Sequence, residues 1–194
     1  MSKVTLDLAW QTDPAWAEYI VAHFDAFLVD HANCERKASA LAMSFVVKYA
    51  DRTPIIQPLI DLAREELAHF DQVYRLMVAR GLTIGDDTPD PYVNALLGLC
   101  RHGKAQRYVD RMLTASIVET RGAERFRLIH EALGEPHLKA FYRDLWASEA
   151  KHGNLFVQLL LLDLPAEEVY GRLGELVQAE ARIAAALPWR PSLH

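Results

Sequence analysis

The chain has 194 residues, of which 51% are hydrophobic, and a formal net charge of −5. This length fits a single domain, 1–194, with a substantial core, and nothing in it suggests two domains. No stretch approaches the roughly 18 uninterrupted apolar residues of a membrane span, and residues 1–8 show no secretory signal, so we expect a soluble cytoplasmic protein.

Helix start and stop signals divide the first half of the chain. Asp13-Pro14 has the form of an N-cap followed by proline at the first helical position, and predicts a helical region from there to about residue 50, bent near 24–30. Thr53-Pro54 repeats this signal. The second helix is expected to run from there to Arg80, with Gly81 as its C-terminal stop.

The second half contains three further long helices. Residues 85–91 predict an irregular connection, followed by a short helix up to about 101. The third long helix is expected over 104–133, the fourth from 135 to about 162, and a fifth from Pro165 to near Pro188. Some two dozen residues separate the second long helix from the third. This long crossover, with no alternating strand pattern anywhere, predicts an all-α, ferritin-like four-helix bundle with extra flanking helices.

One pattern of acidic residues and histidines occurs twice along the chain. Glu35 precedes Glu66-Leu67-Ala68-His69 by 31 residues, and Glu119 precedes Glu149-Ala150-Lys151-His152 by 30. Residues three apart lie on one face of a helix, so each Glu-x-x-His pair can bind one metal ion. Two helices that each give one Glu, and two that each give Glu-x-x-His, form the ligand set of a di-metal carboxylate centre in a four-helix bundle.

Each of these six residues falls on the apolar stripe of its predicted helix, which faces the core. They could be ordinary buried polar residues paired among themselves, or metal ligands. Four carboxylates in one core repel each other and each costs several kcal/mol to bury, and no Arg or Lys shares the stripes. Two divalent cations would balance the four charges, so the sequence favours a di-metal site.

The donor set of carboxylates and imidazoles indicates which metal to expect. It is too rich in oxygen for structural zinc and too rich in nitrogen for calcium or magnesium, which leaves iron or manganese, and of these we favour iron. By position, Glu66 and Glu149 would bridge the metals, and Glu35 and Glu119 would each cap one. The pairing of caps with histidines stays open. His31, one turn before Glu35 on the same face, is either a buried histidine bonded to a carbonyl or water, or part of the site, as a hydrogen-bond donor to a ligand or as an extra ligand.

The residues around these ligands resemble those of a known family. The chain is similar over nearly its whole length to the ferritin-like di-iron carboxylate superfamily, and within it to the bacterial tRNA hydroxylases that act on 2-methylthio-isopentenyl-adenosine beside the anticodon. The segments that carry the resemblance are 31–39, 63–70, 119–126 and 148–152.

The resemblance implies a non-haem di-iron monooxygenase that hydroxylates the isopentenyl group with O2. The implied iron ligands, which are also the catalytic residues, are Glu35, Glu66, His69, Glu119, Glu149 and His152. Two electrons must come from outside. The chain has no Gly-rich dinucleotide turn and only two cysteines, Cys34 and Cys100, so we expect a separate reductase or electron carrier as donor.

A tRNA partner requires clustered cations, although the chain is acidic overall. Residues 101–130 carry seven Arg or Lys against three acidic residues. This segment is either a solvated helix surface or a stripe that steers the anticodon loop and its adenosine to the site. The candidate tRNA-binding residues are Arg101, Lys104, Arg107, Arg111, Arg121 and Arg125.

Three other functions share parts of this pattern. A ferroxidase or peroxide-reducing protein of the ferritin or rubrerythrin kind would use iron as its substrate. A quinone-ring hydroxylase has the same ligands but calls for an amphipathic membrane face. A helical bundle with a structural metal would have a redox-silent centre. Nucleoside analysis of tRNA discriminates between these functions and the tRNA hydroxylase, because only the hydroxylase would change the nucleoside composition of tRNA.

Overall fold

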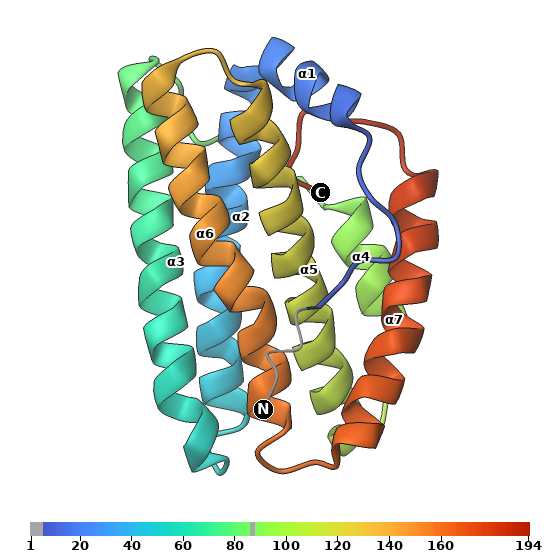
Figure 1. Cartoon of the computed structure of the whole chain (residues 1–194). Helices are drawn as coiled ribbons and strands as arrows, with labels where there is room; N and C mark the ends of the chain where they lie inside the picture. Colours follow the sequence, from blue (N-terminus) through green and yellow to red (C-terminus); the bar gives the residue numbers. More distant parts are fainter. Residues whose placement is uncertain (1–5, 86–87) are drawn as a thin grey trace. The chain divides into compact units, whose positions relative to one another are not determined.

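The computed structural model describes residues 6–85 and 88–194, and over these ranges it contains seven helices and no strand. The helices are shown in Figure 1. They are α1 (Pro14–Ala22), α2 (Phe24–Lys48), α3 (Thr53–Ala79), α4 (Pro91–Gly98), α5 (Lys104–Ala132), α6 (Pro136–Leu160) and α7 (Ala166–Ala186). The all-α prediction is confirmed, and so are the four long helices with a long crossover between the second and the third. Within the described ranges, no helix is both long and apolar enough to span a membrane.

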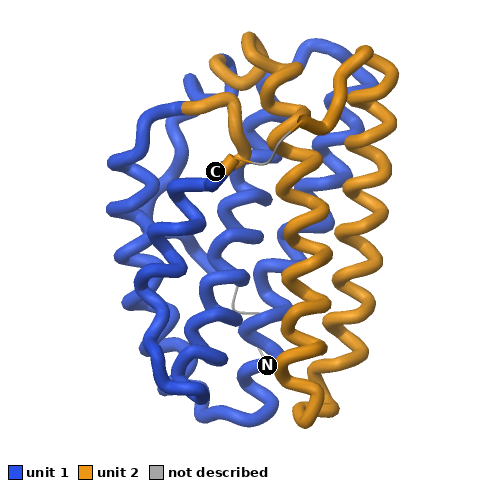
Figure 2. The backbone as a smooth tube through the Cα atoms, turned by 180° about the vertical axis from the view of Figure 1, so that it is seen from behind, with its two compact units in different colours: residues 1–18, 89–189, 194 blue, residues 19–88, 190–193 orange. Residues whose placement is uncertain are grey.

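The chain divides into two compact units, which Figure 2 distinguishes by colour. Unit 1 comprises residues 1–18, 89–189 and 194, and unit 2 comprises residues 19–88 and 190–193. Each unit contains one pair of long helices joined by a short turn. The single domain over 1–194 stays a prediction.

Unit 2 is built on the α2–α3 hairpin, whose two long helices lie side by side in Figure 1. Its core contains Phe27, Leu28, Leu59 and Val73, all with no exposed surface. The predicted bend near 24–30 is a complete break at His23, where α1 ends and α2 begins. The His23 ring donates from Nδ1 to the carbonyl of Tyr19 at 2.8 Å, in the last turn of α1, where carbonyls need partners from outside the helix.

Unit 1 is built on the α5–α6 hairpin, with α4 and α7 packed along α5 (Figure 1). Asp90 begins α4 as an N-cap, accepting hydrogen bonds from the backbone of Tyr92 at 2.8 Å and Val93 at 3.2 Å. The α5 helix is buried on two faces rather than the one that its apolar stripe predicts. Besides the stripe, it buries Asp110, Arg121 and Arg125, so the contacts of these charged residues decide how α5 is held.

A buried ion-pair cluster joins α5 to α7 and to the N-terminal segment of unit 1, residues 6–13. Arg121 has no exposed side-chain surface and donates to Glu180 of α7 at 2.8 and 3.0 Å, to Glu124 at 2.9 Å and to the carbonyl of Trp10 at 2.9 Å. Burial opposes the charge of Arg121, but the hydrogen bonds and charge of Glu180 outweigh it and raise the pKa of the guanidinium. We therefore expect this arginine to stay charged and to fix the N-terminal segment on α5.

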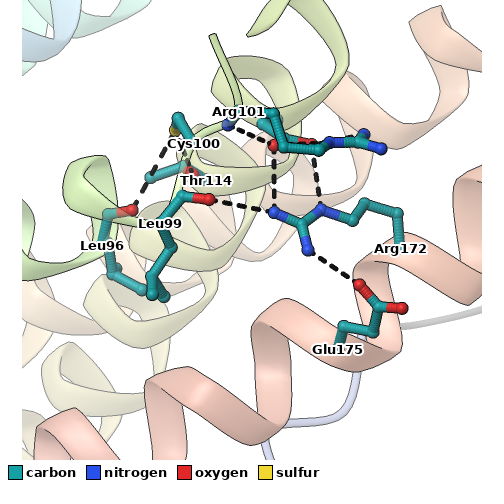
Figure 3. A network of polar contacts seen from close by, with 8 residues as sticks. Leu96, Leu99, Cys100, Arg101, Thr114, Arg172 and Glu175 are labelled. Carbon is teal, nitrogen blue, oxygen red and sulfur yellow. Dashed lines mark hydrogen bonds and ion pairs between the residues drawn. The ribbon is translucent and has the colours of Figure 1, made fainter. Parts of the chain in front are cut away.

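A second network surrounds Asp110, which accepts hydrogen bonds from Arg101 and Arg172, the two arginines labelled in Figure 3. Asp110 accepts from the backbone and guanidinium of Arg101 at 2.8 Å and from Arg172 of α7 at 3.0 Å. Arg172 also donates to the carbonyl of Leu99. Burial alone would raise the pKa of Asp110, but the hydrogen bonds from both arginines outweigh it and lower the pKa to about 2. The network connects the end of α4, the start of α5 and α7.

This lowered pKa predicts a pH dependence of stability. The unfolded aspartate titrates near pH 4 and the folded one near 2, so its contribution is complete above about pH 5 and is lost as the pH falls toward 2. For about two pKa units we expect about 2 kcal/mol. Denaturant unfolding of wild type and Asp110→Asn between pH 7 and pH 3 measures it. The free-energy gap between the two proteins should narrow on acidification, and a constant gap would contradict the assignment.

Candidate metal centre

In unit 2, the first half of the predicted ligand set comes together between α2 and α3. Glu35 of α2 and Glu66 and His69 of α3 each offer one ligand atom within 4.8 Å of the others. Nδ1 of His69 lies 3.4 Å from Glu66 Oε2 and 3.7 Å from Glu35 Oε2. Both carboxylates are buried, with side chains 4% and 1% exposed, and the histidine is 11% exposed. The sequence left open which capping Glu accompanies which His, and within this unit Glu35 accompanies His69.

His31 is bonded to this half-site. Its ring is fully buried and Nε2 lies 2.6 Å from Glu35 Oε1, one helical turn away on α2. An ionised carboxylate only accepts hydrogen bonds, so with Glu35 in the ionised form that binds a metal, Nε2 is the donor. Of the two alternatives for His31, the structure supports a donor that orients the carboxylate of Glu35.

We expect His31→Ala to lower metal affinity by roughly 10- to 100-fold, which is the usual cost of losing a hydrogen-bond partner of a metal ligand. His31→Gln retains an N–H donor and should recover part of the loss. Anaerobic Fe(II) titration of the three proteins measures the effect. A matched control is His23→Ala, because the His23 side chain is exposed and its ring bonds to the carbonyl of Tyr19 in α1. Equal affinities for His31→Ala and His23→Ala would contradict the role of His31.

In unit 1, the second half of the set comes together between α5 and α6. Glu119 of α5 and Glu149 and His152 of α6 each offer one ligand atom within 4.8 Å of the others. Nδ1 of His152 lies 3.2 Å from Glu149 Oε2. All three residues are buried, at 9%, 3% and 4% exposure respectively. The i, i+3 spacing on α6 places Glu149 and His152 on one face, which is the arrangement that the repeated motif predicted.

Each half-site buries two carboxylates beside one imidazole, which is a donor set that fits iron. Two carboxylates beside neutral imidazoles leave negative charge that the interior disfavours strongly. Mixed oxygen and imidazole ligands suit a first-row transition metal rather than calcium or magnesium. The residues present in each unit are therefore compatible with one iron ion per carboxylate–histidine set.

The structure corrects part of the predicted tRNA-binding stripe. Arg121 and Arg125 are 0% and 7% exposed. Arg121 is in the buried ion-pair cluster, and the guanidinium of Arg125 lies 4.8 Å from the centre of the Trp16 ring. Neither side chain is available to a phosphate, so both predictions were wrong. No sequence pattern indicates this burial, because Glu180 and Trp10, which contact Arg121, lie far away in the chain. Arg101 is 39% exposed but already paired with Asp110.

A cavity of about 220 Å³ lies on the side of the α5–α6 hairpin next to this half-site. It is lined from α5, α6 and the N-terminal segment, by Thr120, Ala123, Glu124, Ala150, Asn154, Leu6, Asp7, Leu8 and Gln11. Ala123, a small residue one turn after Glu119 on α5, is among the residues that line this cavity. Ser116 instead donates its hydroxyl to the carbonyl of Gly153 and brings the two helices close together.

Comparison with solved structures defines the class of protein. A Synechococcus protein described as Protein 43 with aldehyde deformylating oxygenase activity matches with a TM-score of 0.89 and 38% identity, and the match covers 96% of this chain and 94% of that one. The fold and the buried carboxylates and histidines thus define a ferritin-like oxygenase.

Within that class the family is specific. The model of the tRNA-(MS2IO6A)-hydroxylase (MiaE) family matches residues 1–194, so the chain belongs to this family. It is an enzyme, a hydroxylase of the 2-methylthio-isopentenyl-adenosine of tRNA.

Two named relatives agree with this assignment. The tRNA 2-(methylsulfanyl)-N(6)-isopentenyladenosine(37) hydroxylase of Pseudomonas putida is 36% identical over 152 residues, which are 78% of this chain and 74% of that protein. The Salmonella typhimurium hydroxylase of the same name is 30% identical over 127 residues, which are 66% of this chain and 46% of that protein.

Proposed function

We propose that this hydroxylase carries a non-haem di-iron centre and uses O2 to hydroxylate the isopentenyl group of its tRNA nucleoside. The proposed iron ligands are Glu35, Glu66, His69, Glu119, Glu149 and His152. The observation that carries the proposal is that, in each unit, a Glu of one helix and the Glu-x-x-His of the next bring three ligand atoms within 4.8 Å of one another in a buried environment.

Iron supplies a two-electron redox chemistry that amino-acid side chains lack. The overall reaction consumes one O2, two electrons and two protons, breaks a C–H bond, and yields one hydroxyl group and one water. The two electrons come from outside, because the chain has only Cys34 and Cys100 and no cysteine cluster. A separate reductase or small electron carrier is therefore its partner. We place the enzyme in the cytoplasm, where its tRNA substrate is.

The chain's own residues bind, orient and shield this centre. Glu66 and Glu149 are the proposed bridging ligands, and Glu35 and Glu119 the caps. His31 holds Glu35 through the 2.6 Å hydrogen bond, and its ring packs 5.5 Å from that of Phe27. Leu62, one turn before Glu66 on α3, and Phe156, one turn after His152 on α6, are 3% and 1% exposed, and we infer that they help to keep water from the ligands. A dry site strengthens each charge interaction inside it.

For tRNA contact we propose the exposed start of α5. Lys104 is exposed, and Arg107 and Arg111 are partly exposed. Lys104→Glu with Arg107→Glu should weaken tRNA binding and lower its salt slope by about one for each lost phosphate contact. Filter binding of tRNA at several salt concentrations measures both quantities. Arg182→Glu, also an exposed arginine of unit 1, is the control, and equal effects of the two changes would remove this surface from the proposal.

Nucleoside analysis of bulk tRNA tests the function directly. Cells with the gene should contain the hydroxylated isopentenyl nucleoside, and cells without it should contain only the unhydroxylated form. Re-expression of the wild type should restore the hydroxyl group, whereas a variant that lacks the metal ligands should not. Unchanged tRNA together with altered iron storage or peroxide sensitivity would favour a ferroxidase or peroxide-reducing protein instead.

A second candidate activity is favoured by the structural comparison. The Synechococcus protein, 38% identical and with a TM-score of 0.89, is described as having aldehyde deformylating oxygenase activity. Supplying a long-chain aldehyde, reductant and O2 to the iron-loaded protein, and measuring alkane and formate, tests for it. Formation of these products with no change in tRNA nucleosides would make the aldehyde the substrate.

A further inference from the structure

In each unit, one serine hydroxyl joins the two helices that carry the candidate metal ligands. In unit 2, Ser39 of α2 donates through Oγ to the carbonyl of Ala63 in α3 at 2.7 Å. In unit 1, Ser116 of α5 donates through Oγ to the carbonyl of Gly153 in α6. Each is a direct side-chain contact between one ligand-bearing helix and the backbone of the next.

Both hydrogen bonds lie about one helical turn from the ligands. Ser39 follows Glu35 by four residues, and its acceptor Ala63 precedes Glu66 by three. The spacing is mirrored in unit 1, where Ser116 precedes Glu119 by three residues and its acceptor, Gly153, follows Glu149 by four. At a rise of about 1.5 Å per residue, the residues of each bond lie roughly 4.5–6 Å along the helix axis from the backbone positions of the glutamates. Each half-site thus has one bridge beside it.

The bridge in unit 1 depends on a close approach of the helix backbones. A Cβ atom added to Gly153 would collide with the Thr120 hydroxyl and lie 3.4 Å from the Thr120 Cβ and backbone nitrogen. The Thr120 hydroxyl in turn donates to the carbonyl of Ser116 at 2.8 Å. A larger residue at position 153 would require the Thr120 side chain to rotate away or α5 to move away from α6.

A serine in the middle of a helix often bonds to a carbonyl of its own helix. Ser44 of α2 does so, donating to Leu41 at 2.7 Å. Ser39, on the same helix, and Ser116 donate across to the neighbouring helix instead. An O–H donor requires an acceptor within about 2.5–3.0 Å, so each bridge restricts the separation and the register of the two helices.

We propose that Ser39 and Ser116, together with Gly153, are positioning residues that set the spacing of the ligand helices within each hairpin and so the geometry of metal binding. This inference rests on the proposed metal function. A ligand set whose members come from two helices binds a metal well only when the helix spacing suits the bond lengths. Neither serine is itself a ligand, and each acts through the helix backbone.

The serines are tested by Ser39→Ala and Ser116→Ala, with Ser44→Ala as the matched control. Anaerobic Fe(II) titration should show about tenfold weaker binding for the first two variants, the low end of the range for residues that support metal ligands. Visible spectra of the Co(II)-loaded proteins should change in the same two variants, because Co(II) absorption reports ligand geometry. Ser44→Ala should match the wild type in both measurements. Ser39→Thr, which retains the hydroxyl, should recover affinity.

A steric pair of variants tests the close approach independently. Gly153→Ala should weaken Fe(II) binding, because the new Cβ meets the Thr120 side chain. Gly153→Ala combined with Thr120→Ala removes that obstacle and should recover part of the affinity. Thermal unfolding of the metal-free proteins identifies any variant that fails to fold.

The outcomes separate this inference from the function on which it rests. Wild-type Fe(II) affinity and an unchanged Co(II) spectrum in folded Ser39→Ala and Ser116→Ala would overturn the positioning role and leave the metal site intact. Effects in Ser44→Ala as large as those in the other two would also overturn it. If the wild type itself bound no Fe(II), the proposed di-iron centre would fail, and this inference with it.

Discussion

Replacing Glu66 by alanine is expected to abolish iron binding and hydroxylation of tRNA. Glu66 is 1% exposed and lies 3.4 Å from the His69 ring, and it is a proposed bridging ligand. The loss of Fe(II) affinity should exceed roughly 100-fold, the upper end for residues that only support a ligand. Iron content per chain and the fraction of hydroxylated nucleoside in tRNA measure the two effects.

Glu65→Ala is the matched control for this variant, because Glu65 is the preceding residue of α3 and lies on the exposed side of the helix. It should retain both iron and activity. A Glu66→Ala protein that still held two iron ions would exclude Glu66 as a ligand.

The same variant separates a metal site from a structural polar cluster. In metal-free protein, a buried carboxylate beside others of like charge is a net cost to folding. Glu66→Ala should therefore leave the melting temperature of the metal-free protein unchanged or raise it, while it removes the stabilisation that added Fe(II) gives to the wild type. A lower melting temperature in the absence of metal would show that Glu66 stabilises the fold itself.

The largest loss of stability is expected for Arg121→Met. Removing one partner of a buried ion pair leaves the other charge uncompensated and typically costs about 3–5 kcal/mol. Arg121 has no exposed side-chain surface, and its removal would leave the fully buried Glu180 without this cation, with the Tyr92 hydroxyl still donating to it at 2.9 Å. For a chain of this size we expect the melting temperature to fall by roughly 10 °C. Thermal unfolding followed by circular dichroism measures it.

Arg127→Met provides the comparison on the same helix. Arg127 pairs with Glu131 at 2.8 Å, but its side chain is 35% exposed, and such i, i+4 surface pairs contribute only about 0.3–0.5 kcal/mol. Its effect should be within a degree or two. Combining Arg121→Met with Glu180→Leu should recover part of the lost stability, since no unpaired Glu180 remains. Equal effects of Arg121→Met and Arg127→Met would contradict a special role for the buried cluster.

The sequence alone determined the helices and the six candidate ligands. Helix ends depend on local signals, and these were present: Asp13 accepts from the backbone of Ala15 at 2.9 Å, and Gly81 ends α3 with a positive φ of 73°. The ligand pattern was also readable, because residues three or four apart on a helix share a face wherever the helix lies. The motif therefore predicted which side chains would meet within each hairpin.

Only the tertiary structure decided how the remaining charged and polar residues are used. Arg121 is buried because Glu180, Glu124 and the carbonyl of Trp10 surround it, and two of these three lie about sixty and one hundred and ten residues away. From the pattern of apolar residues alone, an arginine is predicted to be exposed to solvent, because the pattern contains no information about a partner that far away in the chain. The hydrogen bond between His31 and Glu35 and the serine hydrogen bonds between helices were also decided by the tertiary structure. Each depends on a rotamer or an inter-helix distance, which packing sets and sequence periodicity does not encode.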